Sequence, residues 1–460
     1  MSTEYVEADP SITPEQIEQG QQAYRLDREH VFHSWAAQAQ LDPMTVIKAE
    51  GSYVWDGQGH KLLDFSSQMV NTNIGHSHPA VVAAIQQQAA RIATIAPAHV
   101  NDARSEAARL ISDLVPDHLN HVFFTNAGAE AVEHATRMAR LHTGRPKILS
   151  AYRSYHGGTE QAINITGDTR RFPVDTASQS VVHFMPAYFY RSLFGSTTLE
   201  EETQRALDHL EQTIIFEGPD TIACIILETV PGTAGIYVPP PGYMAGVQRL
   251  ARRYGIMFIT DEVMVGFGRT GAWFGFQHWD LTPDLVTFAK GVNSGYVPLG
   301  GVILSDEIYT SFADRAYPGG LTYSGHPLAC AAAVACIRAM DEEGMVTNAD
   351  RLGREILGPG VVELAEKHPS VGDARGLGAF WALELVTNRE TKEPLAPYGG
   401  SSPAMNAVVA ECKKLGLLPF SNANRIHLAP PLNISDADAR RGLEILDSAL
   451  DVADSYYEGA

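Results

Sequence analysis

The sequence is poor in cysteine, and its cysteines follow no pattern. It contains 4 cysteines in 460 residues. They lie far apart or inside apolar runs, and no Cys-x-x-Cys pair occurs among Cys224, Cys330, Cys336 and Cys412. This spacing excludes a disulfide framework and a zinc knuckle. We expect four reduced thiols in the protein core.

Basic residues are also scarce. The chain has 34 lysines and arginines against 54 aspartates and glutamates, which gives a formal net charge of −20 at pH 7. Negative charge repels a nucleic-acid backbone or an anionic membrane surface unless a local basic patch intervenes, and the sequence has no basic run. We therefore expect neither nucleic acid nor a membrane among the partners.

Long apolar runs are absent as well. No stretch reaches the roughly 18 uninterrupted apolar residues of a membrane-spanning helix. Residues 1–20 are polar and acidic, whereas a secretory signal has basic residues followed by an apolar run. We expect a cytoplasmic protein. With 45% hydrophobic and 19% charged residues the composition is that of a compact globular protein, long enough for about three domains of about 150 residues.

The beginning of the chain contains a helix start and a hairpin. Thr13 is a suitable helix cap, Pro14 fits the first helical position, and Gln16 can reach back as in a capping box. Residues 45–65 then contain two short β-rich runs around Asp-Gly-Gln-Gly at 56–59, which is typical of a hairpin turn. We predict an antiparallel flap there.

Seven apolar runs then alternate with helical patterns. This alternation is the signature of a mostly parallel β-sheet covered by helices. Glycine-rich stretches near 266, 291 and 319 lie beside strand ends, where ligands bind in sheets of this kind. We predict seven strands, over residues 121–124, 148–152, 181–185, 222–227, 256–260, 285–289 and 301–304.

The last third of the chain has a mixed pattern. The alanine-rich residues 328–340 predict a buried helix, and strand-like runs follow at 380–386 and 426–432. Both ends of the chain therefore look like one smaller α+β domain. We predict that this domain and the large α/β domain divide the chain into residues 1–70, 71–335 and 336–460, of which the middle range is the large domain.

The segment 256–271, IMFITDEVMVGFGRTG, has two carboxylates at the end of a predicted strand. Taken alone, Asp261 and Glu262 fit a helix cap or a solvated loop. The segment also contains Gly-x-Gly-x-x-Gly from Gly266, the formal fingerprint of dinucleotide binding. That fingerprint must open a helix, but the residues that follow are aromatic and interrupted by Gly275. A nicotinamide-dependent dehydrogenase is therefore disfavoured.

Lys290 ends another predicted strand and precedes a glycine-rich turn. A lysine that leaves a buried strand either extends toward solvent or is held for reaction. Asp261 ends a strand one βαβ step earlier, which can bring both side chains to the same edge of the sheet. A lysine that forms a Schiff base and an aspartate that pairs with a pyridinium nitrogen are the groups that pyridoxal phosphate requires.

Four motifs, in this order along the chain, carry a resemblance to a known family. YHGG at 155–158, FITDEVMVGFGRTG at 258–271, FAKG at 288–291 and TYSGHP at 322–327 closely resemble the class III aminotransferases of fold type I. The resemblance covers most of the chain. It implies an aminotransferase with pyridoxal 5'-phosphate as its cofactor, built on a mostly parallel seven-stranded large-domain sheet. We expect no metal site.

The resemblance also implies which side chains contact the cofactor ring. Lys290 would form the Schiff base, and Asp261 would pair with the ring nitrogen. Val263 would pack on one ring face and Tyr155 on the other, with His156 beside it in the cofactor-binding set.

For the cofactor phosphate, the resemblance points to TNAGAEAVE, where a strand passes into a helix whose N-terminal amides favour an anion. Gly128 and Ala129 would supply amides, while Ala127 and Ala129 stand where relatives often carry hydroxyls. Thr322 resembles a threonine that the neighbouring subunit adds to this phosphate; taken alone it is a loop hydroxyl. A homodimer with shared active sites follows, with a partner-contacting arm in residues 1–70 and a tetramer left open.

Differences from the family pattern bear on the substrate. Glu228 resembles the first glutamate of the pattern E-P-x-x-G near the ring, with Thr229 in place of proline. Thr233 stands where glutamate-using members carry a second glutamate. Their arginine before the Pro-Pro pair is displaced, since His427 is nearest to its place and Arg425 lies two residues away on the same strand face. Either can receive a carboxylate, a guanidinium better; the alternative for Arg425 is a surface ion pair.

Met69 and Val70 are expected to line the substrate entrance, where relatives often carry a bulky aromatic residue. We predict transfer of an amino group from an aliphatic amine, β-alanine, a taurine-like compound or another ω-amino acid. Thr233 and His427 favour pyruvate over 2-oxoglutarate as the acceptor. A lyase or decarboxylase on the same scaffold, a 2-oxoglutarate-dependent aminotransferase and a cofactor-binding regulatory protein are the alternatives.

Overall fold

The computed structural model describes residues 6–176, 178 and 180–459. Its largest sheet has seven strands in the order β4-β10-β9-β8-β7-β5-β6. β10 is antiparallel to both of its neighbours, and the remaining pairs are parallel. The seven predicted strands and the mostly parallel sheet are confirmed, as β4 (Leu119–Thr125), β5 (Lys147–Ala151), β6 (Val181–Phe184), β7 (Ile222–Glu228), β8 (Met257–Asp261), β9 (Leu285–Phe288) and β10 (Gly300–Ser305).

Helices cover both faces of this sheet, so its strands are apolar at successive positions. On β8, Ile259 packs with the buried side of α5 (Gly128–Thr143), whereas the preceding Phe258 packs with α9 (Tyr243–Arg253). This alternation follows from the two-residue period of a strand. The other helices of this part are α3 (Pro79–Arg91), α4 (Asp102–Ser112), α6 (Glu160–Ile165), α7 (Leu199–Glu217), α8 (Gly232–Gly235), α10 (Asp306–Thr310) and α11 (Pro327–Glu342).

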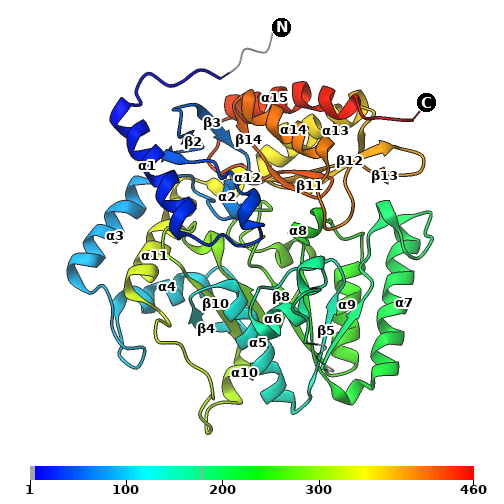
Figure 1. Cartoon of the computed structure of the whole chain (residues 1–460). Coiled ribbons are helices and arrows are strands. Elements are labelled where there is room, and N and C mark those ends of the chain that lie inside the picture. The colour runs from blue at the N-terminus through cyan, green and yellow to red at the C-terminus, as the bar shows by residue number, and fades with distance from the viewer. Residues whose placement is uncertain (1–5, 177, 179, 460) are drawn as a thin grey trace.

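The two ends of the chain lie together on one side of the large sheet (Figure 1). One small sheet combines them directly, because the C-terminal β14 (Leu417–Leu418) pairs in parallel with β3 (Lys61–Asp64) beside β2 (Tyr53–Asp56) and β1 (Val46–Glu50). This arrangement supports the proposal that both termini build one unit, with boundaries near residues 70 and 335.

A second small sheet comes from the C-terminal part alone. Its order is β11-β12-β16-β15, and β13 adds to β12. The strand-like runs predicted at 380–386 and 426–432 correspond to β12 and β16. The strands are β11 (Val371–Leu377), β12 (Phe380–Asn388), β13 (Glu393–Pro394), β15 (Phe420–Asn422) and β16 (Arg425–Leu428).

The remaining helices belong to the two chain ends. They are α1 (Pro14–His30), α2 (Ser67–Val70), α12 (Met345–Leu352), α13 (Gly358–Lys367), α14 (Pro403–Lys414) and α15 (Asp436–Asp454). A π-helical turn, Gly353–Leu357, joins α12 to α13. Short 3-10 turns occur at Gln38–Gln40, Thr169–Arg171, Phe189–Arg191, Pro219–Thr221, Gly275–Trp279 and Lys290–Val292.

Several local predictions are confirmed. Thr13 caps α1 in a capping box with Gln16, and β2 and β3 form the antiparallel hairpin. Residues 263–270 are turns, so the glycine fingerprint does not open a helix. All four cysteines are buried and unbridged. Across the described part of the chain, no helix is both long and apolar enough to cross a bilayer.

Candidate active site

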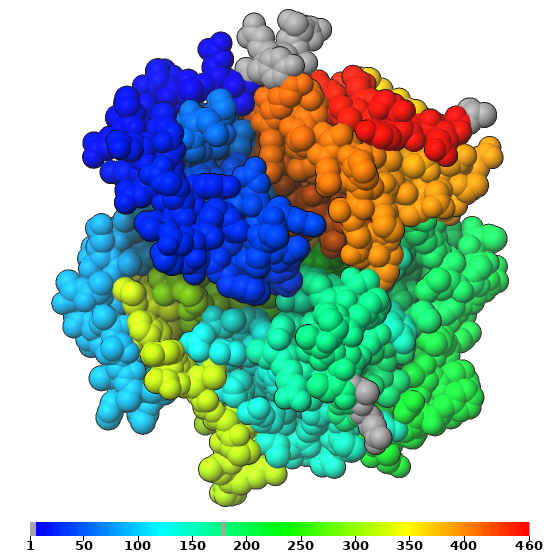
Figure 2. Space-filling view, in the orientation of Figure 1, coloured from blue at the N-terminus to red at the C-terminus, as the bar shows by residue number. Residues whose placement is uncertain are grey.

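A cavity of about 380 Å³ lies at the carboxyl ends of β7, β8 and β9. In Figure 2 the surface is hollowed where the blue N-terminal, orange C-terminal and green central segments meet. Such a strand edge is the usual ligand position in an open α/β sheet. The structure brings most of the predicted site residues to this cavity, namely Met69, Gly128, Ala129, Tyr155, His156, Glu228, Asp261, Val263 and Lys290.

Four predicted site residues do not line this cavity. Val70 is buried in an apolar cluster with Val265. Thr322 is exposed in a turn before α11. Arg425 and His427 are buried on β16 and are not among the residues that line the cavity.

Lys290 and Asp261 come together because β8 and β9 are adjacent and parallel. Asp261 is in register with Thr287, three residues before the lysine. Lys290 follows the end of β9 with a φ of 46°, in the left-handed region that a non-glycine residue rarely adopts. This turn directs the chain out of the sheet at the cavity.

The Lys290 amino group has no hydrogen bond or ion pair with any described residue. Burial lowers its pKa to about 8, while the negative charges of Glu228 and Asp261 act in the opposite direction. Desolvation therefore outweighs the attraction of the two carboxylates. An amine with this pKa has a substantial neutral fraction near physiological pH, which is the nucleophilic and basic form.

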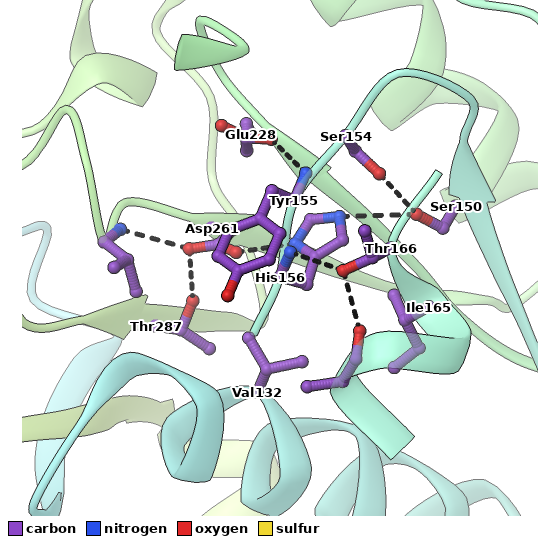
Figure 3. Close-up of polar contacts among 12 residues, drawn as sticks. Val132, Ser150, Ser154, Tyr155, His156, Ile165, Thr166, Glu228, Asp261 and Thr287 are labelled. Atoms are coloured by element: carbon purple, nitrogen blue, oxygen red, sulfur yellow. Dashed lines mark hydrogen bonds and ion pairs between the residues drawn. The ribbon is translucent and has the colours of Figure 1, made fainter. Parts of the chain in front are cut away.

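The Asp261 carboxylate is held on three sides (Figure 3). It accepts hydrogen bonds from Thr287 Oγ1 at 3.0 Å, from the Val263 amide at 3.1 Å and from His156 Nδ1 at 2.6 Å. The other nitrogen of His156 lies 3.3 Å from Ser150 Oγ. Burial would lower the pKa of His156, but the hydrogen bond to Asp261 and its charge outweigh burial and raise it. A buried anion thus faces the cavity in one fixed orientation.

Glu228, at the end of β7, fixes the position of Tyr155. Its carboxylate accepts hydrogen bonds from the Tyr155 amide at 2.9 Å and the Gly232 amide at 3.0 Å. Burial raises the pKa of Glu228. Glu228 therefore acts as a supporting group beside the predicted ring site, because it orients Tyr155.

The N-terminus of α5 forms the opposite end of the cavity. Its cap residue, Ala127, makes no side-chain cap hydrogen bond, and the first amides of a helix have no acceptor within the helix. A Cβ atom on Gly128 would lie 2.8 Å from Val263 Cγ1, so only glycine fits between helix and Val263. Free amides and the helix dipole make this end suitable for an anion.

Two contacts with site residues were missed at the sequence level, and Glu262 is buried rather than part of a helix cap or a solvated loop. Arg170 lies with its guanidinium carbon 3.6 Å from the centre of the Tyr155 ring. Thr287 supports Asp261, and its register with Asp261 is the signal that could have found it. Glu262, the second carboxylate of the Asp-Glu pair, accepts hydrogen bonds from the amides of Gly275 and Phe276, and burial raises its pKa to about 7.

The comparisons with known proteins agree with this geometry. The profile of the family described as aminotransferase class-III matches residues 35–450. The chain is 35% identical to the taurine–pyruvate aminotransferase of Rhodobacter capsulatus, over 92% of this chain and 95% of the relative. It is 33% identical to the putrescine–pyruvate aminotransferase of Pseudomonas aeruginosa, over 93% and 95%.

Solved structures give the same result. The taurine:2-oxoglutarate aminotransferase from Bifidobacterium kashiwanohense, in complex with PLP and glutamate, superposes with a TM-score of 0.91 at 41% identity and covers 95% of this chain and 98% of that one. An (S)-enantioselective omega-transaminase from Thermomicrobium roseum superposes with a TM-score of 0.88 at 36% identity, over 94% and 98%. The chain therefore belongs to the class III aminotransferases, which are pyridoxal-phosphate-dependent enzymes.

Proposed function

We propose that the protein moves an amino group from an amine or ω-amino acid to pyruvate, with pyridoxal phosphate as its cofactor. The observation that carries this proposal is that the Lys290 amine, which has no partner among the described residues, and the anchored Asp261 carboxylate stand at adjacent strand ends. A buried amine without a partner is costly unless it reacts. Its position opposite a buried anion matches the requirements of this cofactor.

The described residues fit the cofactor along its length. Lys290 would bind it covalently, and Asp261 would face the ring nitrogen. Val263 and Tyr155 would contact the two ring faces, with His156 and Glu228 behind them. The amides of Gly128 and Ala129 would bind the phosphate, and the lack of a side-chain cap on α5 leaves them free to do so.

The bound cofactor would supply an aldehyde carbon and an electron-accepting ring. Lys290, in its neutral form, would take the proton from the substrate carbon that carries the amino group. Asp261 would keep a positive charge on the nitrogen that faces it, because a buried carboxylate stabilises an adjacent cation. Tyr155 would exclude water from one face of the reacting atoms.

Two residues bear on the acceptor, and only the first of them lines the cavity. Thr233 lines the cavity where glutamate-using relatives carry a glutamate. Burial lowers the pKa of His427 well below its ordinary value, with a further contribution from Arg425, so a neutral imidazole occupies the place of the displaced arginine. Arg425 forms no ion pair with a described residue, which supports it rather than His427 as a carboxylate ligand.

The choice of acceptor is tested by the two half-reactions. L-Alanine and L-glutamate are each mixed with the holoenzyme, and the near-ultraviolet absorbance change of the cofactor is followed. Faster conversion by alanine supports pyruvate, whereas equal rates, or a faster reaction of glutamate, contradict it. With pyruvate present, nitrogen should appear in alanine in proportion to the amine consumed; release of ammonia or carbon dioxide without an acceptor would indicate a lyase.

We also propose a homodimer with shared active sites, in which Thr322 of a second copy reaches the phosphate. Thr322 is exposed and does not line the cavity of its own chain. The side chains of Phe32 and Trp35 are 84% and 67% exposed, which favours a contact surface in the N-terminal arm. Sedimentation should give a dimer or a tetramer.

The buried, unbridged cysteines support a cytoplasmic location.

A further inference from the structure

Arg170 belongs to the turn Thr169–Arg171, which follows α6 and passes over Tyr155. Its guanidinium stacks on the Tyr155 ring, and Nη2 donates a hydrogen bond of 3.1 Å to Thr233 Oγ1. Both Tyr155 and Thr233 line the cavity. Arg170 therefore contacts two residues of the cavity wall without being a lining residue itself.

The orientation of this guanidinium is fixed by Asp168. The Asp168 carboxylate accepts a hydrogen bond of 2.9 Å from Nε of Arg170 and another from Nη2, and it caps the turn through the Arg170 amide. In the part of the chain that the structure describes, Nη1 of Arg170 has no partner. The planar group is thus held with one donor edge free, an arrangement suited to an oxyanion.

A second arginine lies beside the segment that leads into this turn, since the Arg153 amide donates to the Gly167 carbonyl at 2.9 Å. Arg153 donates to the Tyr237 hydroxyl at 2.7 Å and lies 4.8 Å from the Tyr398 ring centre, and no described carboxylate pairs with it. In a chain with a net charge of −20, Arg153 and Arg170 place two guanidinium groups beside residues 167–168, where Asp168 is the paired carboxylate.

We propose that Arg170 binds an anionic group, a carboxylate or a sulfonate, at the end of the donor remote from its amino nitrogen. This inference rests on the proposed function and narrows it. It assigns ω-amino acids and ω-amino sulfonates as the donor class. A diamine would bring a second cation against Arg170 and is a poor donor, and a neutral amine leaves the free edge of the guanidinium without an acceptor.

The first test measures binding without turnover. Ethanesulfonate and propionate carry the anionic group but no amine, and their dissociation constants from the holoenzyme are measured by calorimetry. Arg170→Gln should weaken both by about 10- to 100-fold, the range for a charge-assisted hydrogen bond. Arg171→Gln is the matched control, since Arg171 sits in the same turn but pairs with Asp175, and it should change binding by no more than about twofold.

The second test compares donors by kcat/KM. Taurine, β-alanine, propylamine and putrescine are compared in the wild type, Arg170→Gln and Arg170→Lys. Arg170→Gln should lower the values for taurine, β-alanine or both, leave propylamine unchanged and improve putrescine. Arg170→Lys should restore part of the loss. A loss for only one anionic donor identifies whether the site takes a sulfonate or a carboxylate.

Two results would overturn the inference. One is an equal loss for propylamine, which would show that Arg170 only holds Tyr155 in place. The other is unchanged affinity for both unreactive anions in Arg170→Gln. If the wild type transferred nitrogen from none of the four donors, the proposed function would fail, and the calorimetric test would still report on Arg170.

Discussion

Lys290, Asp261 and Glu228 form the floor of the cavity and stand at the ends of three adjacent strands. On its wall, Thr233 lies in the one-turn helix α8, and Arg170, which donates a hydrogen bond to Thr233, lies in a 3-10 turn. The floor residues are positioned by sheet register and by buried hydrogen bonds. The wall residues are positioned by side-chain contacts with one another and with Tyr155. On the proposals above, side chains at the strand ends set the type of reaction, and side chains of connecting segments set the choice of donor and acceptor.

Removing the Lys290 amine from the cavity floor should have the largest effect on turnover. Lys290→Ala should lower turnover by at least about 1,000-fold, because it removes both the covalent attachment and the proton-transferring base. The measurement is alanine formation from pyruvate, with borohydride labelling of position 290 in the wild type. Lys147→Ala is a suitable control, since Lys147 begins β5 and pairs with Glu217. Wild-type turnover in Lys290→Ala would refute the scheme.

Removing the anion of the floor should have the next largest effect. Asp261→Asn keeps the shape of the side chain but not its charge, and we expect turnover to fall by about 100- to 1,000-fold, comparable with the loss of one preorganised electrostatic contact. Cofactor absorbance should show that the variant still binds pyridoxal phosphate. Retention of full turnover would reject the electrostatic role of Asp261.

The desolvation of Lys290 should lower the free energy of unfolding, which can be measured. Its pKa of about 8 in the folded protein lies below the ordinary 10.5, so the folded state binds this proton less tightly than the unfolded state and the charged lysine is destabilising below about pH 8. In the cofactor-free protein, Lys290→Met should raise the free energy of unfolding at pH 7 by about 1–3 kcal/mol, allowing for partial solvent exposure.

The stability gained by Lys290→Met should shrink as the pH rises from 8 toward 10. In that range Lys290 of the folded wild type is increasingly neutral, so the wild type no longer has a buried charge to be relieved. Urea unfolding at pH 7 and pH 9.5 gives both values. A gain that is independent of pH would indicate packing by methionine rather than relief of charge. Lys413→Met, on the partly exposed end of α14, serves as the comparison.

A smaller effect separates orientation of Asp261 from its charge. Thr287→Val removes one hydrogen bond to Asp261 with little change of shape, and we expect the first half-reaction to slow by about 3- to 10-fold. The rate is measured in a single turnover. Thr260→Val is the matched control, because the Thr260 hydroxyl is buried on the adjacent strand without a hydrogen-bond partner. Equal effects of both variants would show that the cause is packing.

The floor could be predicted from the sequence, and the reason is geometric. Parallel strands bring their carboxyl ends to one edge, so Asp261 and Lys290 at two such ends must meet once the strands are recognised. The antiparallel insertion of β10 does not disturb this edge, since β8 and β9 remain neighbours.

The wall could not be predicted, because its segments have no period from which a direction can be read. Arg170 lies in a 3-10 turn whose path over Tyr155 depends on Asp168 and Thr233. Val70 was expected at the entrance beside Met69, but a φ of 56° at Val70 directs it into the apolar core. A residue in the left-handed region changes the direction in which the neighbouring side chains point, and a non-glycine residue there cannot be recognised from the sequence pattern.

The parallel pairing of β14 with β3 joins the beginning of the chain to its last tenth. During synthesis from the N-terminus, β3 therefore has an open hydrogen-bonding edge until residues 417–418 leave the ribosome. The central sheet can fold earlier, since its strands are close together in the sequence. The first strands made are thus among the last to be completed, and a nascent chain stalled before this point would present an aggregation-prone edge.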